Sequence, residues 1–128
     1  MAGQLTIDTL RASSGVLATQ NGMTGIAKAW VTFNGSTATI YGGAGVGSFN
    51  VGSITKNGTG DYTVNFTTAM PSTNYATLVT TGTSATADAN CPQVRTDLCT
   101  TSSARVYMKG TNAAFFDVNL YNVAILSS

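Results

Sequence analysis

The sequence predicts an all-β fold, an antiparallel β-sandwich or jelly-roll-like domain. Apolar and polar residues alternate with a period of two over several short segments, as they do in strands with one buried face. Clusters of Gly, Asn and Ser separate these segments, and no segment combines helix caps with an apolar spacing of 3.6 residues. Because 128 residues suit one domain, we expect a sandwich over residues 26–128, preceded by an extended arm of residues 1–25.

The clearest local signal is Ser53–Pro71, which predicts the central hairpin. Residues 56–61 (KNGTGD) contain the Asn and Gly residues that tight turns favour. Tyr62, Val64 and Phe66 alternate with polar residues after the turn, and the strand before it contains Gly52, which we interpret as a β-bulge.

Further strands are predicted on either side of this hairpin. Their ranges are 26–33, 37–41, 48–54, 74–81, 105–110 and 115–126. The glycine-rich residues 42–47 lead into a strand pattern and not a helix, so we interpret them as a loop and not as a phosphate site. The alternation predicts a core of Val31, Phe33, Val64, Phe66, Leu78, Val106, Val118 and Leu120. For Trp30, the only Trp, we favour packing in the core or on the sheet over a platform for sugar stacking.

The composition excludes several function classes. Only 9% of the residues are charged, against about 25% in an ordinary domain, and the net charge is +1. Nucleic acids and anionic membranes require clustered Lys and Arg, and no apolar run could span a bilayer, so neither partner is expected. The chain has no His and no Glu, which removes the commonest general base and a common zinc ligand. We therefore expect no enzyme activity and no cofactor or metal.

The segment 82–104 has the weakest pattern and predicts a long loop. Binding residues concentrate on loops held by a rigid scaffold, so we place a candidate recognition site at Asp88, Asn90, Arg95 and Asp97. The alternative interpretation is an inter-subunit contact or a mobile insertion. Cys91 and Cys99 lie in the same segment: a disulfide between them could contribute on the order of 2–3 kcal/mol, and two free thiols are the alternative.

The N-terminal segment begins with a strand-like pattern. Leu5, Ile7 and Leu10 supply apolar positions that could attach the chain to a neighbouring subunit, and a frayed terminus is the alternative. The first residues lack the basic and apolar regions of a signal peptide, so synthesis in a cytosol is expected.

Three blocks of the sequence resemble short bacteriophage virion proteins of the tail-fibre or receptor-binding type, found in phages of aquatic bacteria. Residues 1–10 are similar to their opening. Residues 27–35 (AKAWVTFNG) resemble a recurring KAWVNFNG segment, and residues 53–71 resemble SITDNGTGDYTVNFTNAMP, with Lys56 where Asp is common. The likeness covers roughly residues 1–80 and fades from Gly82 onward.

The resemblance implies a non-enzymatic virion protein, made in the host bacterial cytoplasm, that forms a homotrimer. One function is host attachment, in which exposed loops contact a surface glycan or protein. The other is decoration of the capsid or tail, with the arm bound to other virion proteins. The length of the chain favours decoration, because 128 residues leave no room for a fibre shaft.

Overall fold

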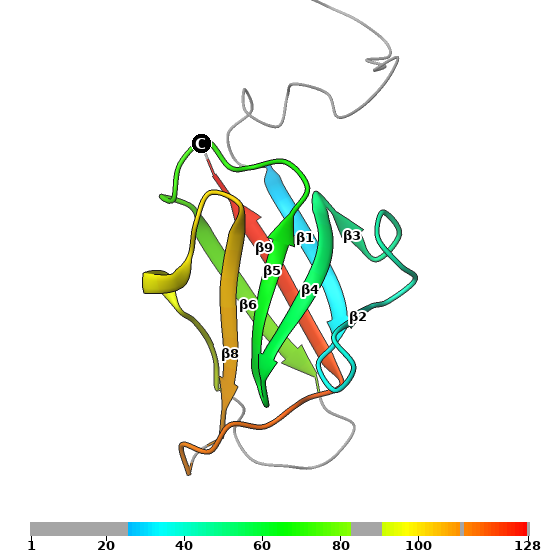
Figure 1. Cartoon of the computed structure of the whole chain (residues 1–128), viewed down its shortest axis with the longest axis vertical. Coiled ribbons are helices and arrows are strands. Elements are labelled where there is room, and N and C mark those ends of the chain that lie inside the picture. The colour runs from blue at the N-terminus through cyan, green and yellow to red at the C-terminus, as the bar shows by residue number, and fades with distance from the viewer. Residues whose placement is uncertain (1–25, 83–90, 111, 128) are drawn as a thin grey trace, which may run out of the picture.

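The structure is a computed structural model that describes residues 26–82, 91–110 and 112–127. Two antiparallel sheets pack face to face in a β-sandwich, so the predicted fold class is confirmed (Figure 1). The strands are β1 (Ala27–Asn34), β2 (Thr39–Ile40), β3 (Ser48–Phe49), β4 (Val51–Gly58), β5 (Asp61–Phe66), β6 (Ala76–Gly82), β7 (Cys91–Val94), β8 (Ser103–Lys109) and β9 (Leu120–Leu126). A short 3₁₀ helix, η1 (Thr96–Leu98), follows β7.

The first sheet has the strand order β2-β1-β9-β6, and β3 also pairs with β1. The second sheet has the order β4-β5-β8-β7. We call them sheet A and sheet B. Strand β6 is an edge of sheet A and β7 is an edge of sheet B, and these two edges lie near each other on one side of the sandwich.

The predicted central hairpin is confirmed, with a shorter turn than expected. Strand β4 continues to Gly58, which pairs with Asp61, so only two residues connect β4 to β5. The second of them, Gly60, has φ 65°, which glycine adopts without steric cost. The register shifts between Val51 and Ser53, so the bulge predicted at Gly52 is also present.

The core lies between the two sheets and is formed by the inward residues of both. The buried hydrophobic residues are Ala29, Val31, Phe33, Ile40, Val51, Tyr62, Val64, Met70, Ala104, Val106, Met108, Val118, Tyr121, Val123 and Ile125. Three aromatic rings occupy its centre. The Phe33 ring stacks on that of Tyr121 at 4.9 Å between centroids, and the Tyr62 ring meets both edge-on.

Five of the eight predicted core residues are buried, and three are not. Phe66 is only half-buried and packs against the edge of the core beside Tyr75. Leu78 was assigned to the wrong face of its strand, because Val79 points inward and Leu78 is 52% exposed. Leu120 is half-buried on the outer face. The predicted strand 115–126 would place Leu120 on the same face as Val118, but β9 begins only at Leu120, and its neighbour Tyr121 points into the core.

Trp30 takes the second of the two positions that the favoured interpretation allowed, on the sheet and not in the core. Its neighbours Ala29 and Val31 are buried, as the alternation predicted, but Trp30 lies on the opposite face and is 40% exposed. It is therefore a surface residue of sheet A and not a core residue.

The predicted loop over 82–104 is wrong at residues 82, 91–94 and 103–104, which belong to strands, whereas residues 95 and 99–102 lie outside the strands and the 3₁₀ helix. Residues 91–94 form strand β7, which pairs with β8 from Cys91 opposite Lys109 to Val94 opposite Val106. Edge strands are short and need only one paired side, so the weak alternation of this segment did not reveal the strand. Among the described residues no helix is long and apolar enough to cross a membrane.

Candidate functional site

The structure describes only part of the predicted recognition site. Asp88 and Asn90 lie outside the described residues, as do Leu5, Ile7 and Leu10 of the predicted arm. Arg95 and Asp97 are described, and so are both cysteines. They lie in and directly after β7, at the edge of sheet B.

Arg95 and Asp97 bind each other. The guanidinium Nε and Nη2 of Arg95 donate to the two carboxylate oxygens of Asp97 at 3.0 and 2.8 Å. This hydrogen bonding holds the pKa of the Asp97 carboxyl below its ordinary value. The two side chains are 42% and 62% exposed, so solvent screens the pair and it adds little stability. The pair is a neutral, bidentate unit on the surface, and not two free charges.

Cys91 and Cys99 are free thiols, so the structure has the second of the two predicted states. Cys91 begins β7 opposite Lys109, whereas the Cys99 sulfur accepts from the Arg105 amide at 3.5 Å. Lys109 and Arg105 are four residues apart on β8, a rise of about 13 Å along the strand, so the two cysteines lie beside well-separated positions of β8. A disulfide requires Cα atoms within about 7 Å of each other.

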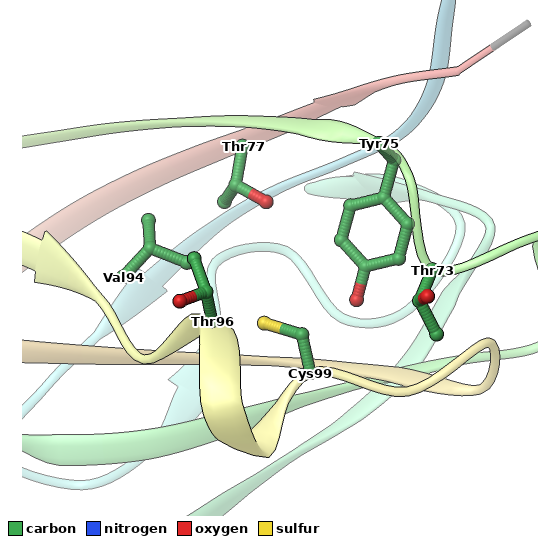
Figure 2. A pocket seen from close by; sticks show the side chains of 6 residues that line it. All are labelled: Thr73, Tyr75, Thr77, Val94, Thr96 and Cys99. Atoms are coloured by element: carbon green, nitrogen blue, oxygen red, sulfur yellow. The ribbon is translucent and has the colours of Figure 1, made fainter.

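A pocket of about 150 Å³ lies between the β6 side and the β7 side of the sandwich (Figure 2). Its lining residues come from the segment before β6, from β6 itself, and from β7 and η1; they are Thr73, Tyr75, Thr77, Val94, Thr96 and Cys99. Figure 2 shows the Thr77 side chain, the Tyr75 ring and the Cys99 sulfur around one hollow. Thr96 lies between Arg95 and Asp97 in the chain, but neither member of that ion pair lines the pocket.

The Tyr75 hydroxyl anchors one wall of this pocket. It lies 2.9 Å from the carbonyl oxygen of Thr100 and 2.8 Å from that of Ser103, to which it donates. Burial, together with the nearby Cys99 sulfur, raises the pKa of this phenol well above its ordinary value, so it remains protonated. The Tyr75 hydroxyl therefore ties the turn before β8 to the residue that precedes β6.

The lining provides hydrogen-bonding groups without charge. Thr73, Thr77 and Thr96 each carry a hydroxyl that can donate and accept, and no lining residue is charged. Such a pocket suits a small neutral group that carries hydroxyls or amides. Sequence reasoning missed Thr73, Tyr75 and Thr77, because they lie outside the predicted loop and become its neighbours only when the two sheet edges meet.

The other ion pairs of the described residues connect parts of the scaffold. Arg105 binds Asp61 across β8 and β5 with two bonds of 2.6 and 2.8 Å. Lys56 binds Asp117 at 2.5 Å, and Lys109 lies 4.8 Å from the centre of the Phe115 ring. Within the described ranges, no three Cys or Asp side chains gather as metal ligands would.

Comparisons of the chain with protein-family models, with curated proteins and with solved structures give no match.

Proposed function

We propose that the chain is a non-enzymatic bacteriophage virion protein that contributes to host attachment as a homotrimeric tail-fibre or receptor-binding component. Two of the three sequence blocks that resemble such proteins lie on β1 and on the hairpin of β4 and β5, and the third, residues 1–10, lies outside the described residues. These strands carry much of the core, including Phe33, Tyr62 and Val64. The likeness therefore concerns the scaffold, and the segment where it fades supplies one half of the pocket lining of Figure 2, namely Val94, Thr96 and Cys99.

The pocket between β6 and β7 is the observation that carries the attachment role. It is lined by three Thr hydroxyls, the Tyr75 ring, Val94 and Cys99, and it lies between two strands that are each paired within their own sheet. A rigid scaffold with an uncharged hollow that combines apolar surface with hydroxyl groups is suited to a surface glycan or to the backbone of a surface protein.

The proposed assembly is a homotrimer bound to the virion through residues 1–25. The low content of charged residues supports it, since copies of the chain repel each other little over distance. Deletion of residues 1–20 is expected to weaken attachment to particles while the sandwich keeps its melting temperature. Full occupancy of particles by the truncated chain would contradict the role of the arm.

Point variants of the pocket test the attachment role. Thr77→Val and Thr96→Val remove hydroxyls from the lining at nearly constant volume, and Thr59→Val changes an exposed Thr in the β4–β5 turn as the matched control. Phages that carry the pocket variants are expected to hold normal amounts of the protein and to adsorb more slowly to host cells than phages with Thr59→Val. Equal adsorption of all three would contradict the proposal.

Decoration of the capsid or tail is the second candidate function, and strand β6 favours it. In the described part of the chain β6 pairs only with β9, and none of its residues is charged or Pro. An unprotected edge strand can accept a strand from a neighbouring protein. Particles that lack the protein would then lose stability to heat while they adsorb normally.

A further inference from the structure

The outer face of sheet A carries a row of apolar side chains across four strands. Trp30 of β1 pairs with Phe49 of β3 on one side and with Ala124 of β9 on the other, and Ala124 pairs with Leu78 of β6. Directly opposed residues of adjacent strands point to the same face. Phe49, Trp30 and Leu78 are 37%, 40% and 52% exposed, so the row is open to solvent.

A polar row lies beside it, two residues further along β1. Thr32 pairs with Asn122, and Asn122 pairs with Thr80. The Thr32 hydroxyl donates to Asn122 Oδ1 at 2.9 Å, and Asn122 Nδ2 donates to Thr80 Oγ1 at 3.4 Å. An amide has two N–H donors and an oxygen with two lone pairs, so Asn122 keeps one donor and one acceptor position for a ligand.

The two rows enclose a groove of about 210 Å³. The outward side chains that line it are Trp30, Thr32, Leu78, Thr80, Asn122 and Ala124. Lys28 is the one charged residue in the strands of sheet A, and its side chain is buried. The surface therefore offers no charge to an ionic ligand, and a neutral ligand matches it best.

The area of the face argues for a small ligand. Three strands of seven or eight residues and two strands of two residues, spaced by about 4.8 Å, give a face of about 400 Å². A stable interface between two proteins buries about 800 Å² on each partner, so this face alone is too small for a second copy of the chain. It is large enough for one or two rings of a small molecule.

We propose that this groove binds a neutral saccharide, with one sugar ring on the Trp30 indole and the ring hydroxyls on Asn122, Thr32 and Thr80. A sugar ring presents a face of C–H groups, which packs on an aromatic ring, and a rim of hydroxyls, which need donors and acceptors beside that ring. The groove supplies both in adjacent rows. The inference rests on the proposed role in host attachment, because it names a saccharide as the host group that is bound. It places that saccharide on the outer face of sheet A, which shares no lining residue with the pocket between β6 and β7.

Trp30 reports binding directly, because it is the only Trp in the chain. The full chain is titrated with glucose, galactose, mannose, N-acetylglucosamine and their β-linked dimers, and the fluorescence of Trp30 is followed. A saturable change with at least one of these sugars is the expected result. No saturable change with any of them, up to their solubility limits, overturns the inference.

Matched variants assign the binding to the groove. Asn122→Ala keeps the fluorescent reporter, and Asn65→Ala is its control, because Asn65 makes the same kind of bridge on sheet B, to Ser53 and Thr55 at 3.1 and 2.9 Å. Asn122→Ala is expected to weaken binding and Asn65→Ala to leave it unchanged. By calorimetry, Trp30→Ala is expected to reduce the affinity about tenfold, and Phe115→Ala, which removes an exposed ring elsewhere, to have no effect. Equal effects within either pair overturn the inference.

Two other occupants give different results. If Trp30→Ala lowers the oligomeric state in sedimentation, the face binds a second copy. If deletion of residues 1–20 shifts the Trp30 emission to longer wavelength without sugar, the face binds the chain's own N-terminal segment. Either result overturns the saccharide inference. The proposed function is judged separately by adsorption of particles without the protein, so loss of adsorption without sugar binding leaves that function in place and rejects only this inference.

Discussion

The Tyr62 hydroxyl donates a hydrogen bond of 2.5 Å to the Asp117 carboxylate, which joins β5 of sheet B to the segment that leads into β9 of sheet A. The same carboxylate oxygen accepts from the Gly60 amide at 2.7 Å, and the other oxygen accepts from Lys56 Nζ at 2.5 Å. One carboxylate therefore fixes the position of the central hairpin relative to the segment before the last strand.

Asp117 should make the stability depend on pH. Burial alone would raise the pKa of its carboxyl, but the bonds from Lys56, Tyr62 and Gly60 outweigh burial and lower it. The unfolded chain therefore takes up a proton first as the pH falls. The stabilisation is present above the ordinary pKa of Asp, about 4, and is lost as the pH falls through the lower pKa of the folded state.

Asp117→Asn tests this dependence. At neutral pH the variant is expected to be about 1–2 kcal/mol less stable than the wild type, because charge-assisted hydrogen bonds are weakened. Below pH of about 4 the difference should shrink, since protonation weakens the same bonds in the wild type. Urea unfolding from pH 7 downward measures it, with Asp97→Asn, an exposed pair, as the control. A difference that stays constant with pH would contradict the role of the carboxylate.

Gly35 is expected to tolerate no side chain. A Cβ at this position would lie 2.6 Å from the Val118 carbonyl oxygen and 2.6 Å from the Tyr121 ring. Gly35→Ala should therefore cost about 1–3 kcal/mol through overpacking. Gly58→Ala is the control, because a Cβ there meets nothing within 4 Å. Equal melting temperatures for both variants would show that the contact around Gly35 relaxes freely.

Two Phe→Ala variants should separate the core from its edge. Phe33 is fully buried and stacks on Tyr121, so Phe33→Ala should cost about 3–5 kcal/mol. Phe66 is half-buried, so Phe66→Ala should cost less than Phe33→Ala, although its position in the central hairpin predicted a full core residue. Chemical denaturation of both variants measures the order, and the reverse order would place the core elsewhere.

The sequence predicted the scaffold better than the surface, for a physical reason. Alternation identifies β1 and β5 because each has one face against the core, and Val31, Phe33, Tyr62 and Val64 are buried. Alternation alone does not say which face is inward when both carry apolar residues. Leu78 was predicted on the inner face for that reason, and the groove beside Trp30 could not be predicted, because Leu78 and Thr80 reach it only through the pairing of β6 with β9.

The candidate pocket depends on pairings between distant parts of the chain. Thr73, Tyr75 and Thr77 become neighbours of Thr96 and Cys99 only because β6 and β7 are edges on the same side of the sandwich. No local pattern encodes that neighbourhood. Arg95 and Asp97 could be selected from the sequence as charged residues, but their mutual binding is a result of the turn through η1.

Free thiols at both cysteines predict that stability is insensitive to reductant. The melting temperature should be the same with and without a thiol reductant, and thiol titration of the unfolded chain should find both cysteines reduced. In the folded chain the exposed Cys91 should react faster than the half-buried Cys99, whose thiol also donates to the Arg95 carbonyl at 3.3 Å. A reductant-dependent melting temperature would indicate a bond that this fold does not contain.

Replacing residues 91–98 with a Gly/Ser linker of equal length separates a strand from a loop. A surface loop can be replaced at small cost, but β7 pairs with β8 at four positions and covers its outer edge. The replacement should therefore destabilise the protein by on the order of 2–4 kcal/mol, because the ladder bonds are lost and the edge of β8 is uncovered.

The Arg95→Ala and Asp97→Ala double variant is the control: it removes the exposed ion pair and keeps the strand, so its melting temperature should remain close to that of the wild type. Equal stability of the linker variant and the wild type would contradict the pairing of β7. The expected loss also means that a failure of the linker variant to adsorb phages to cells could result from unfolding, so point variants of the pocket are the valid test of attachment.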